Sequence, residues 1–123
     1  GAQADAPIDV EGIKLVTKRV AGLEKGALRA VSDSLRDRLG SGVVVLASET
    51  DGRVSLVVSV SKDLTGRIQA GRVVKALAPI VGGGGGGRPD FAEAGGKDPS
   101  KIEALLTEAP STLRSLLQGD THL

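Results

Sequence analysis

The sequence predicts an α/β domain in which helices pack against a small mixed β-sheet. Residues 42–60 contain two runs rich in β-branched and apolar residues, and a Thr-Asp-Gly turn signal separates them, as in a β-hairpin. Segments with apolar residues at helical spacing precede and follow this hairpin. The 123 residues are 40% hydrophobic and 25% charged, a composition typical of a soluble globular domain that is long enough to bury a core.

The first half of the chain divides into elements by local pattern. Residues 12–22 place β-branched residues between glycines and are expected to form a strand. Residues 24–40 carry leucine and valine at helical spacing, and Gly40 occupies the position where helices commonly end. Residues 42–49 are apolar almost without interruption, as in a central strand covered on both faces. Residues 53–60 are expected to return as the second arm of the hairpin.

The second half is predicted to be mainly helical. A polar, turn-rich segment leads into a helix at residues 72–81, which Pro79 should kink or fray. A second helix is expected at residues 97–109, with Asp98 as its N-cap and proline at its first position. Pro110 should interrupt that helix, so that residues beyond it form a separate short turn. With residues 82–96 as a loop, the order is strand–helix–strand–strand–helix–loop–helix.

The domain is expected to occupy residues 8–118, between a small, polar linker that frays at residues 1–7 and a tail at residues 119–123. The chain contains no methionine and begins Gly-Ala-Gln-Ala, from which we expect a piece of a larger protein. No stretch approaches the roughly 20 apolar residues needed to cross a bilayer, so no membrane association is expected.

Composition excludes several classes of function. The chain has 16 basic and 15 acidic residues, so its net charge is close to zero. An anionic partner would therefore have to bind a local basic patch, because the net charge cannot attract it. The absence of cysteine rules out disulfides and zinc–thiolate sites and favours a reducing compartment. Phe91 is the single aromatic residue, which excludes the usual nucleic-acid platform of stacked aromatic rings.

The six consecutive glycines at residues 82–87 require an explanation. Ordering each glycine costs roughly 0.5–1 kcal/mol more than ordering alanine, so the run is either a spacer or a place where missing side chains are used. Packed elements on both sides and a second pair, Gly95 and Gly96, favour close approach by another segment of the domain or by a ligand. Standard dinucleotide and phosphate-loop motifs do not fit, because the run follows a helix and precedes Arg-Pro.

Catalysis is not expected from this chain. Asp90, Glu93 and Asp98 lie near the glycines, and paired carboxylates can serve as acid and base or bind a metal. The only histidine, His122, lies in the terminal tail, and no Cys, Tyr or Trp supplies a nucleophile or proton relay. Glu93 and Asp98 are better explained as a solvated side chain and a helix cap, so no metal or catalytic residue is predicted.

The stretch GGGGGGRPDFAEAGGKDPSK at residues 82–101 resembles the glycine-rich signature of the DHH-associated domain at the C-terminus of bacterial alanyl-tRNA synthetases. The resemblance extends to residues 22–48 and 52–75, in the same order, and covers roughly residues 8–118. The phosphoesterase branch of the family has a shorter glycine motif. Pro110 departs from the family pattern, and we expect it to interrupt the last helix.

The resemblance implies a non-catalytic, tRNA-binding domain in the cytoplasm. It would contact the elbow of alanine-specific tRNA and help couple aminoacylation with the editing of mischarged tRNA. The parent enzyme, an alanine–tRNA ligase, would use ATP and magnesium, with zinc in its editing domain, whereas the fragment itself needs no cofactor. The main chain of the glycines would contact bases and donate N–H groups to phosphates, and nearby basic side chains would attract the phosphates. The expected RNA-binding residues are Lys62, Thr65, Gly66, Arg67, Gly84, Gly85, Gly86, Gly87, Arg88, Gly95, Gly96 and Lys97, and Lys62, Arg67, Arg88 and Lys97 are expected to flank two loops that the fold brings together.

Two alternatives belong to other classes. The domain could be the substrate-clamping half of a DHH-family phosphoesterase or exonuclease, in which case a metal-binding Asp-His-His motif would precede it. It could also be a dimerisation module, in which an exposed sheet edge pairs with a second copy to form a weak homodimer.

Overall fold

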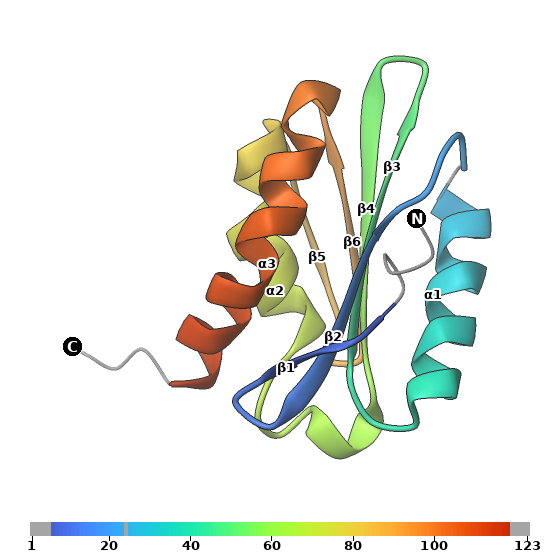
Figure 1. The fold of residues 1–123 in the computed structure, drawn as a ribbon. Coiled ribbons are helices and arrows are strands. Elements are labelled where there is room, and N and C mark those ends of the chain that lie inside the picture. Colours follow the sequence, from blue (N-terminus) through green and yellow to red (C-terminus); the bar gives the residue numbers. More distant parts are fainter. Residues whose placement is uncertain (1–5, 24, 119–123) are drawn as a thin grey trace.

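A six-stranded sheet in the order β1-β2-β3-β4-β6-β5 forms the centre of the protein (Figure 1). The computed structural model describes residues 6–23 and 25–118. β2 and β3 are parallel and the other neighbours are antiparallel, so the predicted mixed sheet is confirmed. The strands are β1 (Ile8–Val10), β2 (Ile13–Arg19), β3 (Val43–Thr50), β4 (Arg53–Val60), β5 (Gly84–Gly87) and β6 (Phe91–Gly96).

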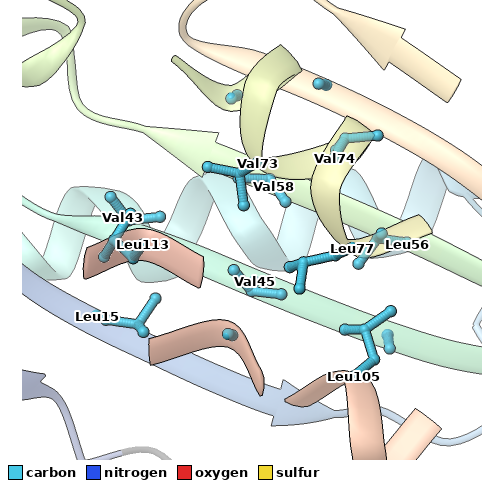
Figure 2. Packing of buried hydrophobic residues seen from close by; sticks show 14 of the residues in the cluster. Leu15, Val43, Val45, Leu56, Val58, Val73, Val74, Leu77, Leu105 and Leu113 are labelled. Carbon is cyan, nitrogen blue, oxygen red and sulfur yellow. The ribbon is translucent and has the colours of Figure 1, made fainter. Parts of the chain in front are cut away.

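Within the described residues, three α-helices cover the two faces of the sheet. Helix α1 (Lys25–Leu39) lies on one face, whereas α2 (Ala70–Leu77) and α3 (Ile102–Leu117) lie on the other (Figure 1). The larger core lies on the α2 and α3 side (Figure 2). A smaller core lies under α1. The predicted central strand is confirmed, because Val43 and Val45 of β3 face the larger core and Val44 faces the smaller one.

Turn and cap chemistry behaves as the sequence indicates. Asp51 and Gly52 join β3 to β4 with φ angles of 55° and 75°, which is the two-residue hairpin geometry that an Asp-Gly pair favours. Gly40 ends α1 with φ of 75°, and its N–H donates to the carbonyl of Arg36 at 3.1 Å. The Asp98 side chain accepts the N–H of Ser100 at 3.1 Å and so caps a 3-10 turn that leads into α3.

The prediction of a loop at residues 82–96 is wrong. This segment forms β5 and β6, an antiparallel hairpin that adds to β4 through β6. Glycine is depleted in strands and carries no side chain from which an alternating pattern could be seen, so the residues of β5 contained no strand signal. The short strand β1 was also missed, and it pairs with β2 at the other edge of the sheet.

The prediction that Pro110 interrupts the last helix is also wrong. α3 continues through Pro110, and Leu105, Ala109 and Leu113 on both sides of it are buried in the larger core. Burial of this apolar stripe outweighs the local loss of one helical hydrogen bond. Pro79 does shorten its helix, since α2 ends at Leu77 and a 3-10 turn follows over Ala78–Val81.

Residues 1–5 of the expected linker and the expected tail at residues 119–123, with His122, lie outside the described residues. Among the helices of residues 6–23 and 25–118, none is both long and apolar enough to cross a membrane.

Candidate nucleic-acid interface

The candidate cations lie at two opposite ends of the β5–β6 hairpin. Arg88 lies in the turn between the strands, whereas Lys97 follows the last residue of β6 at the other end. A six-residue strand spans about 20 Å. The expectation that the fold gathers all four cations around two adjoining loops is therefore wrong for Lys97, because the antiparallel pairing holds the ends of β6 apart.

Lys62 and Arg88 do come together, on one open hollow of about 870 Å³ at the turn end of the hairpin. The C-terminal half of α1, the segment after β4 and the β5–β6 turn form its walls. We call it the turn-end hollow. Its lining residues are Arg29, Asp33, Arg36, Asp37, Gly40, Ser61, Lys62, Asp63, Arg88, Asp90 and Phe91. Four cations and four carboxylates balance in this lining, so the hollow has little net charge.

Most of the charges in the turn-end hollow are already paired. Arg36 lies 3.4 Å from a carboxylate oxygen of Asp33 and also 3.4 Å from one of Asp37. The guanidinium of Arg88 is 3.9 Å from Asp90, at the limit of an ion pair. Lys62 is exposed and forms no ion pair within the described residues. Lys62 is thus the cation of this hollow that is most available to an anion.

A hydroxyl donates a hydrogen bond to the carboxylate of Asp63, next to Lys62, and favours its ionised form. Ser41 Oγ donates to Asp63 Oδ2 at 2.6 Å. This hydrogen bond, followed by one from Ser61, lowers the pKa of Asp63 from its ordinary value of 3.8. Because Asp63 stays charged, it opposes the approach of a phosphate to that side of the hollow.

Phe91 does not offer a stacking surface. Its ring is 7% exposed and belongs to the core under α1. The guanidinium of Arg29 lies over the ring, 4.2 Å from its centroid, in cation–π geometry. Phe91 is the only aromatic residue in the chain, so its burial leaves no exposed ring on which a base could stack.

Thr65, Gly66 and Arg67 follow the turn at residues 62–64. The Thr65 hydroxyl donates to the carbonyl of Lys62 at 2.9 Å, and the Thr65 carbonyl accepts from Gln69 Nε2 at 2.6 Å. The hydroxyl and the carbonyl of Thr65 therefore both close the local turn. Gly66 and Arg67 are exposed.

The opposite end of the hairpin carries a smaller hollow of about 320 Å³, which contains Gly95, Gly96 and Lys97. Gly96 is required there by packing, because a Cβ on it would lie 2.6 Å from Val81 Cγ2. Arg53 also lines this hollow. It was not among the expected residues, since a lone arginine at a strand start carries no distinguishing pattern.

The glycines of β5 alternate between two roles. A Cβ on Gly85 would lie 2.2 Å from the carbonyl oxygen of Glu93, and one on Gly87 would lie 2.6 Å from Ala92 Cα. Gly83 is tighter still, whereas Gly84 has no atom within 4 Å of its Cβ position. Every second glycine thus permits close packing of β5 on β6, which is the intramolecular form of the close approach that the sequence indicated.

Two cations that the sequence analysis missed lie beside β5. Arg72 and Lys75 are exposed on α2 and line a groove of about 210 Å³. We call it the α2–β5 groove. Its lining residues are Gln69, Gly71, Arg72, Lys75, Gly87, Arg88 and Pro89. The signal was present in the sequence, since the two basic residues are three apart on the helix face opposite the apolar stripe.

The described residues offer no group of three His, Cys, Asp or Glu side chains that could hold a metal ion.

Comparison with known proteins identifies the family. Residues 12–115 match the DHHA1 domain. The chain is 48% identical over 109 residues to the alanine–tRNA ligase of Desulfosudis oleivorans, covering 89% of this chain and 12% of that protein. The same enzyme of Pelotomaculum thermopropionicum is 48% identical over 111 residues, covering 89% and 13%. The chain thus spans about an eighth of the length of these relatives.

Solved structures agree with this family. The C-Ala domain from Aquifex aeolicus alanyl-tRNA synthetase superposes with a TM-score of 0.82 at 30% identity, covering 88% of this chain and 97% of that one. A DHH domain of the s1p family of ribosomal proteins superposes with a TM-score of 0.61 at 18% identity, covering 95% of this chain and 28% of that one. At this identity the likeness shows only that the two chains share a fold. The chain therefore belongs to the DHHA1 domain family, in the form found as the C-Ala domain of alanyl-tRNA synthetases.

Proposed function

We propose that this chain is a non-catalytic tRNA-binding domain of an alanine–tRNA ligase. It contacts the elbow of alanine-specific tRNA and helps the aminoacylation and editing sites of the parent enzyme share one substrate. The observation that carries the proposal is the 48% identity to alanine–tRNA ligases over 89% of the chain. The parent enzyme works in the cytoplasm with ATP and magnesium, and with zinc in its editing domain.

The proposed RNA contacts combine exposed cations with main chain. Lys62 and Arg88 lie on the turn-end hollow, and Arg67 and Lys97 are exposed. The Arg88 N–H donates to the Phe91 carbonyl at 2.8 Å, so these two residues form a hydrogen-bonded pair of the ladder. In an antiparallel ladder, hydrogen-bonded and non-hydrogen-bonded pairs alternate. Gly85, three positions before Arg88, therefore falls in a non-hydrogen-bonded pair, and its N–H and C=O point away from β6. β5 is an edge strand, so these groups are available to a ligand.

Binding by this domain alone is expected to be weak and sensitive to salt. Three or four phosphate contacts give a slope of log K against log[salt] of about −2 to −4. Within the parent enzyme, tethering raises the effective concentration of the domain next to tRNA that is already held elsewhere. A modest intrinsic affinity is therefore sufficient for the proposed role.

The test compares full-length alanine tRNA with an acceptor-stem minihelix that lacks the elbow. The chain should bind the full tRNA more tightly, and Lys62→Ala/Arg88→Ala should weaken that binding several-fold. Lys14→Ala/Arg38→Ala is the matched control, because both residues are exposed and form no ion pair within the described part of the chain. Equal affinity for tRNA and minihelix would overturn the proposal.

The dimerisation alternative is tested in the same samples. Sedimentation velocity over a range of concentrations should show a monomer that shifts only when tRNA is added. Self-association that tRNA does not change would favour pairing through the exposed β5 edge over RNA binding.

A further inference from the structure

We propose that the α2–β5 groove is a phosphate-binding site, at which Arg72, Lys75 and Arg88 hold successive phosphate groups of the RNA backbone. The inference rests on the proposed function, since it names the surface of the domain that RNA contacts. It moves the main electrostatic contact away from the turn-end hollow and onto α2, where the sequence analysis placed no RNA-binding residue.

The α2–β5 groove and the turn-end hollow differ in net charge. Three cations and no carboxylate line the α2–β5 groove, whereas four cations and four carboxylates line the turn-end hollow. Arg72 and Lys75 form no ion pair within the described residues. Within the described residues, the ion pair that these cations form joins Arg88 to Asp90 at 3.9 Å, and the Arg88 side chain is 70% exposed. A phosphate entering the groove therefore displaces at most one weak, exposed ion pair.

The cations of the α2–β5 groove come from α2 and from the β5–β6 turn. Arg72 and Lys75 are three residues apart on α2, so their side chains project from the same face of the helix. Arg88 enters the groove from the β5–β6 turn. The Cε of Lys75 lies 3.8 Å from the Cβ position of Gly86, so the stem of this exposed lysine passes beside the glycine strand. Two separate elements thus bring three cations to one surface.

The main chain beside the groove offers a hydrogen-bond donor. A Cβ on Gly71 would lie 3.1 Å from the Gly87 carbonyl oxygen, so glycine at this position lets the two main chains approach closely beside the groove. The neighbouring amides are used internally, since Ala70 N–H donates to Pro89 and Arg72 N–H donates to Gln69. The Gly71 N–H has no acceptor within the described structure. A donor beside three cations matches the needs of a phosphate oxygen.

The first arm of the test measures binding of full-length alanine tRNA to Arg72→Ala/Lys75→Ala at several salt concentrations. The affinity should fall several-fold, and the magnitude of the salt slope should fall by about 1.4–1.8 for two lost phosphate contacts. Lys14→Ala/Arg38→Ala removes the same two charge types from the α1 side of the sheet and should leave the slope unchanged. Far-UV circular dichroism checks that each variant folds.

The second arm separates phosphate in RNA from free phosphate. In ¹H–¹⁵N spectra, tRNA should shift the Gly71 and Gly87 amide signals of the wild-type chain, and Arg72→Ala/Lys75→Ala should reduce these shifts. Pyrophosphate should shift the same two signals at higher concentration. Shifts with pyrophosphate but none with tRNA would overturn the assignment of the groove to RNA.

Failure of this inference is distinguishable from failure of the proposed function. If tRNA still binds with elbow dependence and the groove variant behaves like the control variant, the groove assignment is overturned while the proposed function stands. If the chain binds tRNA and minihelix equally and the groove variant weakens both, the phosphate site stands and the elbow contact is overturned.

Discussion

Gly71 of α2 and Gly87 of β5 meet main chain to main chain, and a Cβ on Gly71 would lie only 3.1 Å from the Gly87 carbonyl oxygen. This contact seats the first turn of α2 on the end of the edge strand. Both glycines line the α2–β5 groove, and a side chain at Gly71 would press on the main chain of Gly87. The glycines therefore act first through packing within the domain, and the exposed surface that results is available to RNA.

Gly85→Ala should destabilise the domain, whereas Gly84→Ala should not. The new Cβ at position 85 would lie 2.2 Å from the Glu93 carbonyl oxygen, while position 84 has no atom within 4 Å. Forcing β5 away from β6 should lower the free energy of unfolding by about 1–3 kcal/mol, and the change at Gly84 should stay within about 0.5 kcal/mol. Urea unfolding followed by circular dichroism measures both, and equal effects would contradict the alternating roles.

The buried serine pair between α1 and β4 should respond asymmetrically to mutation. Ser32 Oγ donates to the Arg29 carbonyl at 2.9 Å and lies 2.8 Å from Ser59 Oγ, so we infer that Ser59 donates to Ser32. Ser32→Ala leaves the Ser59 hydroxyl buried without an acceptor and should lower the free energy of unfolding by about 1–3 kcal/mol.

Ser59→Ala should have a smaller effect, because Ser32 keeps its bond to Arg29. The double variant should be more stable than the sum of the single changes indicates, since neither hydroxyl is then stranded. A double-mutant cycle in urea measures this coupling. Equal single effects with simple additivity would show that the two hydroxyls do not depend on each other.

Ser41→Ala should raise the pKa of Asp63 toward 3.8, because it removes the largest cause of the lowering. A carboxyl whose pKa is lower in the folded chain than in the unfolded chain stabilises the fold at pH values above the unfolded pKa. This contribution is lost as the pH falls through the folded pKa. The urea midpoint of Ser41→Ala should therefore fall below wild type at neutral pH, and the difference should shrink well below pH 3.8. A carboxyl-detected NMR titration checks the shift directly, and an unchanged Asp63 pKa would contradict the assigned cause.

Pro110→Ala should stabilise the domain. It restores an N–H that can donate to the carbonyl of Leu106 within α3, and the gain of about 3 kcal/mol in helix propensity is partly offset by a more flexible unfolded chain. We expect the midpoint of thermal unfolding to rise. Ser111→Ala, at the neighbouring exposed helical position, is the control for propensity alone and should raise it much less.

Local patterns were sufficient for much of the fold. The apolar stripe of α1 with Gly40 at its end, the alternation of β3 and β4 around Asp51 and Gly52, and the Asp98 cap were all predictable, because each depends on residues within a few positions of one another. The family resemblance rested on the same kind of local signature. Lys62 and Arg88 were also expected to lie close together, and they share one hollow.

The sequence by itself therefore determined the α/β class, the helices, the central hairpin and the family. Only the tertiary structure decided that the glycine run is the edge of the sheet, that α3 passes Pro110, and that Arg72 and Lys75 share a groove with Arg88. These outcomes depend on contacts between residues far apart in the chain, such as the pairing of Leu56 with Ala94. Glycine adds no side-chain pattern of its own, so its role becomes visible only when the strand packed against it is in place.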